Sequence, residues 1–213
     1  MKRLALLFPA ALLACATTGA ASADRGGAGT SAPSSAAAQL RDDMRKLWED
    51  HVTYTAFFYK AAINGSDDAG KIAERLLRNQ DDIGNAVKPF YGDAAGNKVA
   101  SLLRDHILIA ADVVKAAKAG DSAALDQANK KWYQNADDLA ATLASVNPNW
   151  PQKTLQDALH THLQMVTDQV VATLHHDAAA AIAAYDKGAE HMLMVADVLS
   201  SGIVKQFPDR FRS

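Results

Sequence analysis

Apolar residues recur at three- and four-residue spacing from about residue 39 to the C-terminal region. This spacing places the apolar side chains on one face of an α-helix. Turn and capping residues divide the pattern into six expected helices. These helices span about residues 39–63, 68–87, 93–119, 122–146, 151–175 and 177–204. The pattern therefore predicts an all-α protein.

The segments between the expected helices are short and carry residues that end helices. Asn64-Gly65 and Gly120 are typical helix stops. Pro89 is expected to end the second helix near Val87, because proline disfavours a helical residue before it. Short loops between long helices predict that consecutive helices run antiparallel.

The chain also repeats itself with a shift of 56 residues. The shift superposes residues 79–82 on residues 135–138, and His106 on His162. The first unit fits with an offset of one residue. We therefore expect three repeated helical hairpins, which close into an antiparallel six-helix bundle.

Each helix of the expected hairpins carries a polar residue near its middle. In antiparallel helices of similar length, these midpoints share one level across the bundle. The residues at this level are His51, Asn79, His106, Asn135, His162 and His191. Flanking apolar residues indicate that the histidines face inward. Asp82 and Asp138 each follow an asparagine by three residues, so we expect them on the same helix face, one turn on.

A buried layer of imidazoles and carboxylates is costly unless something satisfies its polar groups. A divalent transition metal does so, and neutral imidazole and carboxylate suit iron, copper, zinc or manganese. Helical bundles build such sites from facing helices. The expected ligands are His51, His106, His162, His191, Asp82 and Asp138. Non-covalent haem is an alternative cofactor, because Met165 and Met194 follow two of the histidines by three residues.

A structural interpretation fits the same residues. Interior histidines often hydrogen-bond a carboxylate or a backbone carbonyl without binding a metal. If the chain arose by duplication of one unit, each copy would inherit such a contact. The function would then be that of a non-enzymatic envelope protein that presents a surface to a partner. The two alternatives differ in whether the imidazoles converge on one point.

The composition excludes several classes of function. The net charge is −2 and no block of lysine and arginine occurs, so nucleic acid is not an expected partner. Cys15 is the only cysteine, which excludes thiolate zinc sites and cysteine catalysis in the helical domain. The chain has no glycine-rich phosphate loop, no Gly-x-Ser-x-Gly and no His-Glu-x-x-His. Enzymatic activity is therefore not predicted.

The N-terminus has the pattern of an export signal. Lys2 and Arg3 precede an apolar run, Leu4 to Leu13, which is too short to span a bilayer. This pattern predicts a protein that leaves the cytoplasm.

Two cleavage sites fit the N-terminal segment. Small residues ending at Ala23 predict a signal peptide of residues 1–23 and a periplasmic protein. Alternatively, Leu12-Leu13-Ala14-Cys15 resembles a lipoprotein box, which predicts cleavage after residue 14 and membrane attachment through lipidated Cys15. In the first case residues 24–38 form a flexible low-complexity linker before a bundle domain of residues 39–211.

Several strings resemble those of an uncharacterised family of small bacterial all-helical exported proteins. They are Leu76-Leu77-Arg78-Asn79-Gln80-Asp81-Asp82, Lys88-Pro89-Phe90-Tyr91-Gly92, Asn147-Pro148-Asn149-Trp150, His191-Met192-Leu193-Met194 and Gln206-Phe207-Pro208. The resemblance covers about residues 40–211. Some members carry the names glycosyltransferase or acetylglutamate kinase. Those names imply α/β folds, and this chain has no βαβ pattern. The resemblance therefore implies a helical fold and no ligand residues.

Overall fold

The computed structural model describes residues 36–212, and in this part of the chain all regular structure is helical. The predicted all-α class is confirmed. The helices are α1 (Ala36–Asn64), α2 (Ala69–Ala119), α3 (Ser122–Val146), α4 (Gln152–Leu174), α5 (Ala178–Gln206) and the short 3₁₀ helix η1 (Pro208–Arg210). The predicted export signal, both predicted cleavage sites and Cys15 lie outside the described residues. No helix among residues 36–212 combines the length and the apolar character needed to cross a membrane.

The boundary expected near Val87 is wrong. Helical structure continues through Pro89, and the break in α2 falls at Gly92, which has a φ of 81° and a ψ of 169°. Glycine tolerates a positive φ because it has no Cβ. The helix is therefore interrupted at Gly92 and not at Pro89. Five α-helices therefore stand where six were expected, and the second consists of two arms.

The two arms of α2 fold back on each other. A Cβ built on Gly84 would lie 2.6 Å from the carbonyl oxygen of Gly96 and 2.6 Å from the Cβ of Ala100. Residues 84 and 100 would lie about 24 Å apart in a straight helix, so the chain reverses between them. Glycine at positions 84 and 96 allows the backbones of the two arms to touch.

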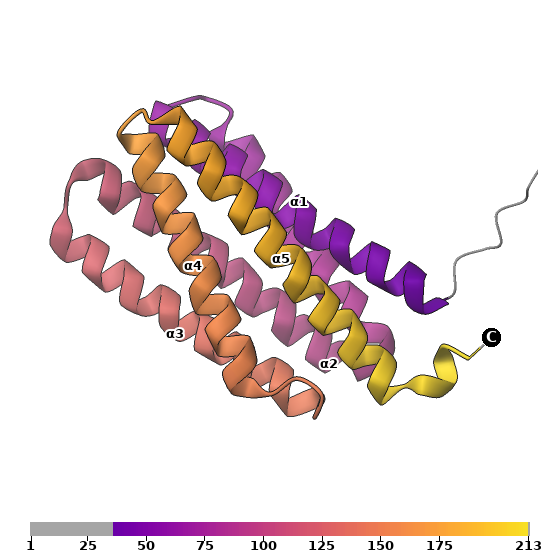
Figure 1. The fold of residues 1–213 in the computed structure, drawn as a ribbon. Helices are drawn as coiled ribbons and strands as arrows, with labels where there is room; N and C mark the ends of the chain where they lie inside the picture. The colour runs from indigo at the N-terminus through magenta and orange to yellow at the C-terminus, as the bar shows by residue number, and fades with distance from the viewer. Residues whose placement is uncertain (1–35, 213) are drawn as a thin grey trace, which may run out of the picture. The chain divides into compact units, whose positions relative to one another are not determined.

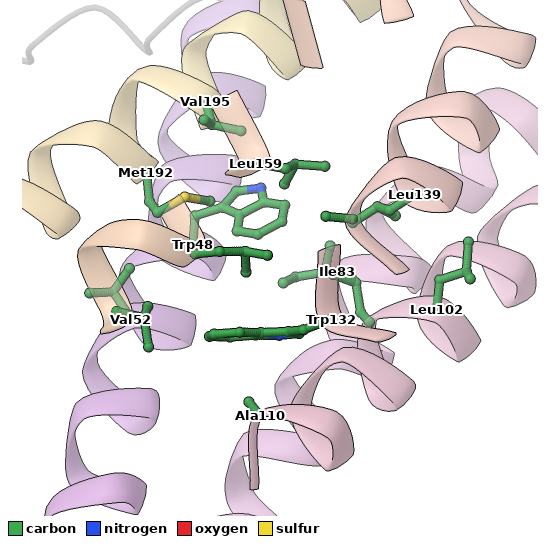
Figure 2. Packing of buried hydrophobic residues seen from close by; sticks show 14 of the residues in the cluster. Trp48, Val52, Ile83, Leu102, Ala110, Trp132, Leu139, Leu159, Met192 and Val195 are labelled. Carbon is green, nitrogen blue, oxygen red and sulfur yellow. The ribbon is translucent and has the colours of Figure 1, made fainter. Parts of the chain in front are cut away.

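The helices form a closed ring. Each of α1 to α5 packs on the next along the chain, and α5 packs back on α1 (Figure 1). The core inside the ring includes the indoles of Trp48 and Trp132, with Ile83, Leu139 and Met192 (Figure 2). All five of these side chains are buried.

One end of the bundle is closed by aromatic side chains. The ring of Tyr91 lies 5.4 Å from Trp150 and 5.5 Å from Phe207, measured between centroids. The Tyr91 hydroxyl donates to Gln206 Oε1 at 3.0 Å and accepts from Asn147 Nδ2 at 2.8 Å. These contacts join the break in α2, the α3–α4 turn and the end of α5. Three of the strings that carry the family resemblance therefore meet here.

At this end of the bundle, Gly202 lies so close to Trp150 that adding one methyl group should lower the stability of the fold strongly. A Cβ built on Gly202 of α5 would lie 2.0 Å from Nε1 of the buried Trp150. Gly202→Ala should therefore displace the indole and lower the free energy of unfolding by roughly 3 kcal/mol, as overpacked cores do.

The matched control is Gly188→Ala in the same helix, where the added Cβ would have its nearest neighbour 3.9 Å away, at the Cβ of Met165. This variant should stabilise the protein slightly, because alanine is the better helix former. Urea denaturation of both variants measures the difference. Equal stability of the two would contradict the packing described for Trp150.

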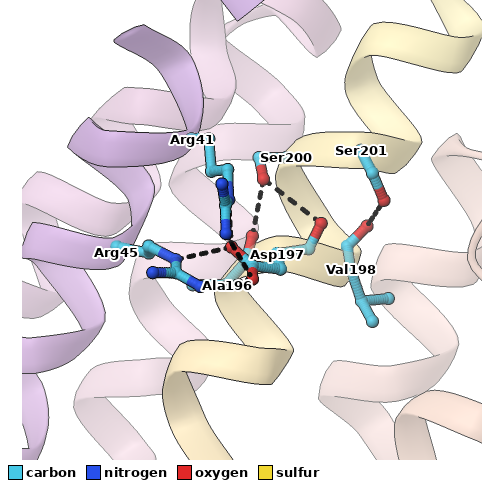
Figure 3. Close-up of polar contacts among 7 residues, drawn as sticks. All are labelled: Arg41, Arg45, Ala196, Asp197, Val198, Ser200 and Ser201. Carbon is cyan, nitrogen blue, oxygen red and sulfur yellow. Dashed lines mark hydrogen bonds and ion pairs between the residues drawn. The ribbon is translucent and has the colours of Figure 1, made fainter. Parts of the chain in front are cut away.

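Asp197 of α5 forms ion pairs with two arginines of α1, Arg41 and Arg45 (Figure 3). Its carboxylate accepts from Arg41 Nε at 2.9 Å and from Arg45 Nη2 at 2.6 Å. The hydrogen bonds from Arg45 and Arg41 hold the pKa of Asp197 well below its usual range. The three side chains are partly exposed, so this cluster sets the register of α1 on α5 more than it stabilises the fold.

Candidate functional site

The structure places three of the expected histidines together in the core. His51 on α1, His106 on the second arm of α2 and His162 on α4 are all buried. The His162 ring lies 5.6 Å from the His51 ring and 6.3 Å from the His106 ring, measured between centroids. The expectation that the histidines face inward at one level is met for these three.

Both ring nitrogens of His106 have partners. Trp132 Nε1, which can only donate, lies 3.0 Å from His106 Nε2, so this nitrogen carries the lone pair. The proton is therefore on Nδ1, which donates to Asn135 Oδ1 at 2.8 Å. Asn135 Nδ2 in turn donates to the carbonyl of Leu102 at 3.0 Å. This chain of hydrogen bonds leaves His106 no free lone pair.

Beside His51, two residues together make the contacts that Asn135 alone makes beside His106. His51 Nδ1 donates to Gln80 Oε1 at 3.2 Å, and Asn79 Nδ2 donates to the carbonyl of Leu47 at 3.0 Å. Gln80 Nε2 joins the two amides by donating to Asn79 Oδ1 at 3.1 Å.

The comparable contact to a backbone carbonyl of α4 comes from an imidazole and not from an amide. His191 Nε2 donates to the carbonyl of Ala158 at 2.8 Å, so it takes the place of the amide nitrogen. An imidazole offers no oxygen to accept from the neighbouring ring. Consistent with this, Nδ1 of His162 is buried and makes no hydrogen bond to the described residues.

Burial keeps the three clustered histidines neutral. Loss of solvent lowers the pKa of His51 to about 3 and that of His106 to about 4, although the bonds to Gln80 and Asn135 oppose the shift. The pKa of His162 lies well below its ordinary value, first because the ring is buried and then because a proton on it would be repelled by protons on His51, His106 and His191. At neutral pH these three rings therefore carry no charge.

The structure does not bring Asp82 and Asp138 to the layer. Both side chains are exposed, and Asp138 accepts from Gln134 Nε2 at the surface. A spacing of three residues turns a side chain about 60° away from its predecessor around the helix. That rotation carries both carboxylates from the buried face to the solvent. His191 is only half-buried and is bound to a backbone carbonyl.

Among residues 36–212, no group of three or more His, Cys, Asp or Glu side chains is arranged to hold a metal ion. A cavity beside Trp132, the partner of His106, has a volume of about 70 Å³ and mostly apolar walls, which include Tyr59 and Val166. It is far smaller than the pocket that a haem occupies.

Two residues that hydrogen-bond the clustered histidines, Gln80 and Trp132, were not predicted from the sequence. Gln80 follows His51 by 29 residues, the same interval that separates His106 from Asn135. Alignment by this interval identifies Gln80. No comparable signal marks Trp132, because a tryptophan at helical spacing is indistinguishable from ordinary core.

The chain matches no protein-family model, no curated protein sequence and no solved structure. Its function is therefore inferred from the residues themselves.

Proposed function

We propose that this chain is an exported, non-enzymatic binding protein whose buried histidine layer is structural. The observation that supports this most is the environment of His106, since both of its nitrogens are used by Trp132 and Asn135. A metal is not needed to satisfy a ring that the protein already satisfies. The exposed positions of Asp82 and Asp138 support the same conclusion.

We also propose that the fold arose from three repeated hairpins. Counted in this way, the two arms of α2 are separate helices and the bundle has six. The same hydrogen bond occurs three times, from Asn79, Asn135 and His191 to backbone carbonyls 32, 33 and 33 residues earlier. The arms of α2 would belong to different hairpins, joined at Gly92. A copied polar contact specifies how each hairpin closes, and the histidine layer is then the inherited product of that contact.

A second candidate function is metal binding, and one observation favours it. His162 Nδ1 is buried without a partner, and the His51 ring lies 5.6 Å away. Both rings are held neutral, which is the state that binds a transition metal. Iron, copper, zinc or manganese would then be held by His51 and His162, and His106 would contribute only after giving up Trp132. Haem would require the core to open.

A melting series separates the two candidates. In the structural proposal, the melting temperature of the wild type is unchanged by iron, copper, zinc or manganese, and His162→Ala lowers it equally with and without metal. In the metal proposal, a hundredfold excess over the dissociation constant stabilises the wild type by about 2.7 kcal/mol, and His162→Ala abolishes that gain.

The control variant is His175→Ala, at the exposed α4–α5 turn. It should behave as the wild type does in every condition. A metal-dependent rise that His162→Ala removes and His175→Ala retains would replace the structural proposal with the metal one.

A further inference from the structure

A groove with mostly apolar walls lies at the end of the bundle opposite the aromatic cluster. It has a volume of about 630 Å³ and runs between the C-terminal part of α1, the end of α4 and the start of α5. The end of α1 and the α4–α5 turn lie at the same end of the molecule (Figure 1). This volume falls in the range of small-molecule sites.

The sequence of α5 explains why the groove is open. The helix begins with four alanines, Ala178 to Ala181, whose side chains are too short to fill the space beside α1. Tyr59 is buried at this site. The side chains of Phe57 and Ile182 remain 54% and 62% exposed, although large apolar side chains are usually covered. Two such residues in one concave site mark it as a place for an apolar ligand.

A buried amide in the groove indicates what else the ligand carries. Gln169 of α4 lines the groove and is only 8% exposed. Its side-chain amide makes no hydrogen bond to the described residues, although its backbone carbonyl accepts from Thr173 Oγ1 at 2.8 Å. The amide atoms are not among the buried polar atoms that lack a partner, so the amide opens into the groove and offers a ligand both a donor and an acceptor. A single hydroxyl or amide on the ligand would satisfy it.

The charges around the groove select a neutral molecule. Lys60 and Asp177 both line it, so their formal charges cancel. Neither an anion nor a cation is therefore favoured over an uncharged ligand.

We propose that this groove binds a small neutral amphiphile: an aromatic or branched aliphatic body against Phe57 and Ile182, and one uncharged hydrogen-bonding group on Gln169. The inference rests on the proposal that the chain is a binding protein and names the class of its ligand. It does not depend on the histidine layer, so the two proposals fail in different experiments. Metal-dependent melting would overturn the first and leave this one intact.

The site is tested by titrating the purified protein with the neutral fluorophore N-phenyl-1-naphthylamine at pH 7.5. Saturable binding with one site per chain is expected. Ala181→Trp places a large side chain in the groove and should weaken binding at least about tenfold. Phe57→Ala should weaken it about five- to tenfold through the loss of apolar contact.

The matched control is Leu108→Ala on the second arm of α2. Leu108 is 55% exposed, almost the same as Phe57, but it lies outside this groove. Its replacement should leave binding unchanged. Absence of saturable binding, or binding that Ala181→Trp does not weaken, would overturn the site.

The role of Gln169 is tested by displacing the fluorophore with 1-naphthol and with naphthalene, which differ by one hydroxyl. The wild type should prefer 1-naphthol about five- to tenfold, the value of one net hydrogen bond. Gln169→Leu keeps the volume similar and should remove that preference while retaining naphthalene binding. Equal affinities for the two ligands in the wild type would overturn the assigned ligand class.

Discussion

Replacing His106 with alanine is expected to lower the free energy of unfolding by about 3–5 kcal/mol, with or without added metal. His106 is 4% exposed and links Trp132 to Asn135. Its removal leaves a cavity, an indole N–H without an acceptor and an amide oxygen without a donor. Each unpaired buried group costs about 1–3 kcal/mol, and the cavity adds to this.

Urea denaturation at pH 7.5 measures the change, with His175→Ala as the exposed control. A double-mutant cycle with Trp132→Phe isolates the indole–imidazole bond. Phenylalanine keeps an aromatic side chain at this position but lacks the N–H donor of the indole. The two substitutions should be less destabilising together than the sum of their separate effects. A loss under about 1 kcal/mol for His106→Ala would contradict the hydrogen-bond chain.

The second large effect concerns acid. Stability should fall steeply as the pH drops from about 6.5 to about 4, because the unfolded chain takes up protons on histidines that the folded chain keeps neutral. The folded pKa values of His51 and His106 are lowered to about 3 and about 4, and that of His162 is lowered as well. Their contribution is therefore complete above about pH 6.5 and is lost below it.

The three rings together cost about 4 kcal/mol for each pH unit below 6.5, since one pKa unit corresponds to about 1.4 kcal/mol per group. A domain with an unfolding free energy of about 5–10 kcal/mol should thus unfold between about pH 5.3 and pH 4. The lowered pKa of Asp197 acts in a separate window, because its contribution disappears only below about pH 4.

Unfolding free energies at pH 7.5, 6.5 and 5.5 test this expectation. His175→Ala and His176→Ala should leave the slope unchanged, because both residues are exposed at a turn. A stability that stays level between pH 7.5 and pH 5.5 would show that the buried rings are not held neutral.

Periodicity predicted the helical class and most helix ends, because amphipathic helices repeat their burial every turn. The location of the break in α2 was missed. It is decided by which residue can adopt a positive φ, and Gly92 accepts it whereas Pro89 remains inside the helix.

The candidate site was predicted in part. Repeat spacing located His51, His106 and His162, since equivalent positions in repeated hairpins fall at one height. The same argument put Asp82 and Asp138 in the layer, although a rotation of about 60° suffices to expose a side chain. The bond from Trp132 to His106 depends on side-chain direction across two helices, which spacing along one chain does not contain.

The most direct test of the structural histidine layer is the protonation state of its rings, read from the side-chain nitrogen signals of the folded protein by NMR. His106 should carry its proton on Nδ1, stay neutral down to about pH 5, and keep the same nitrogen shifts after an equivalent of zinc is added. A proton on Nε2, a titration near pH 6.5, or a shift of the His106 and His162 nitrogens on addition of zinc would contradict it.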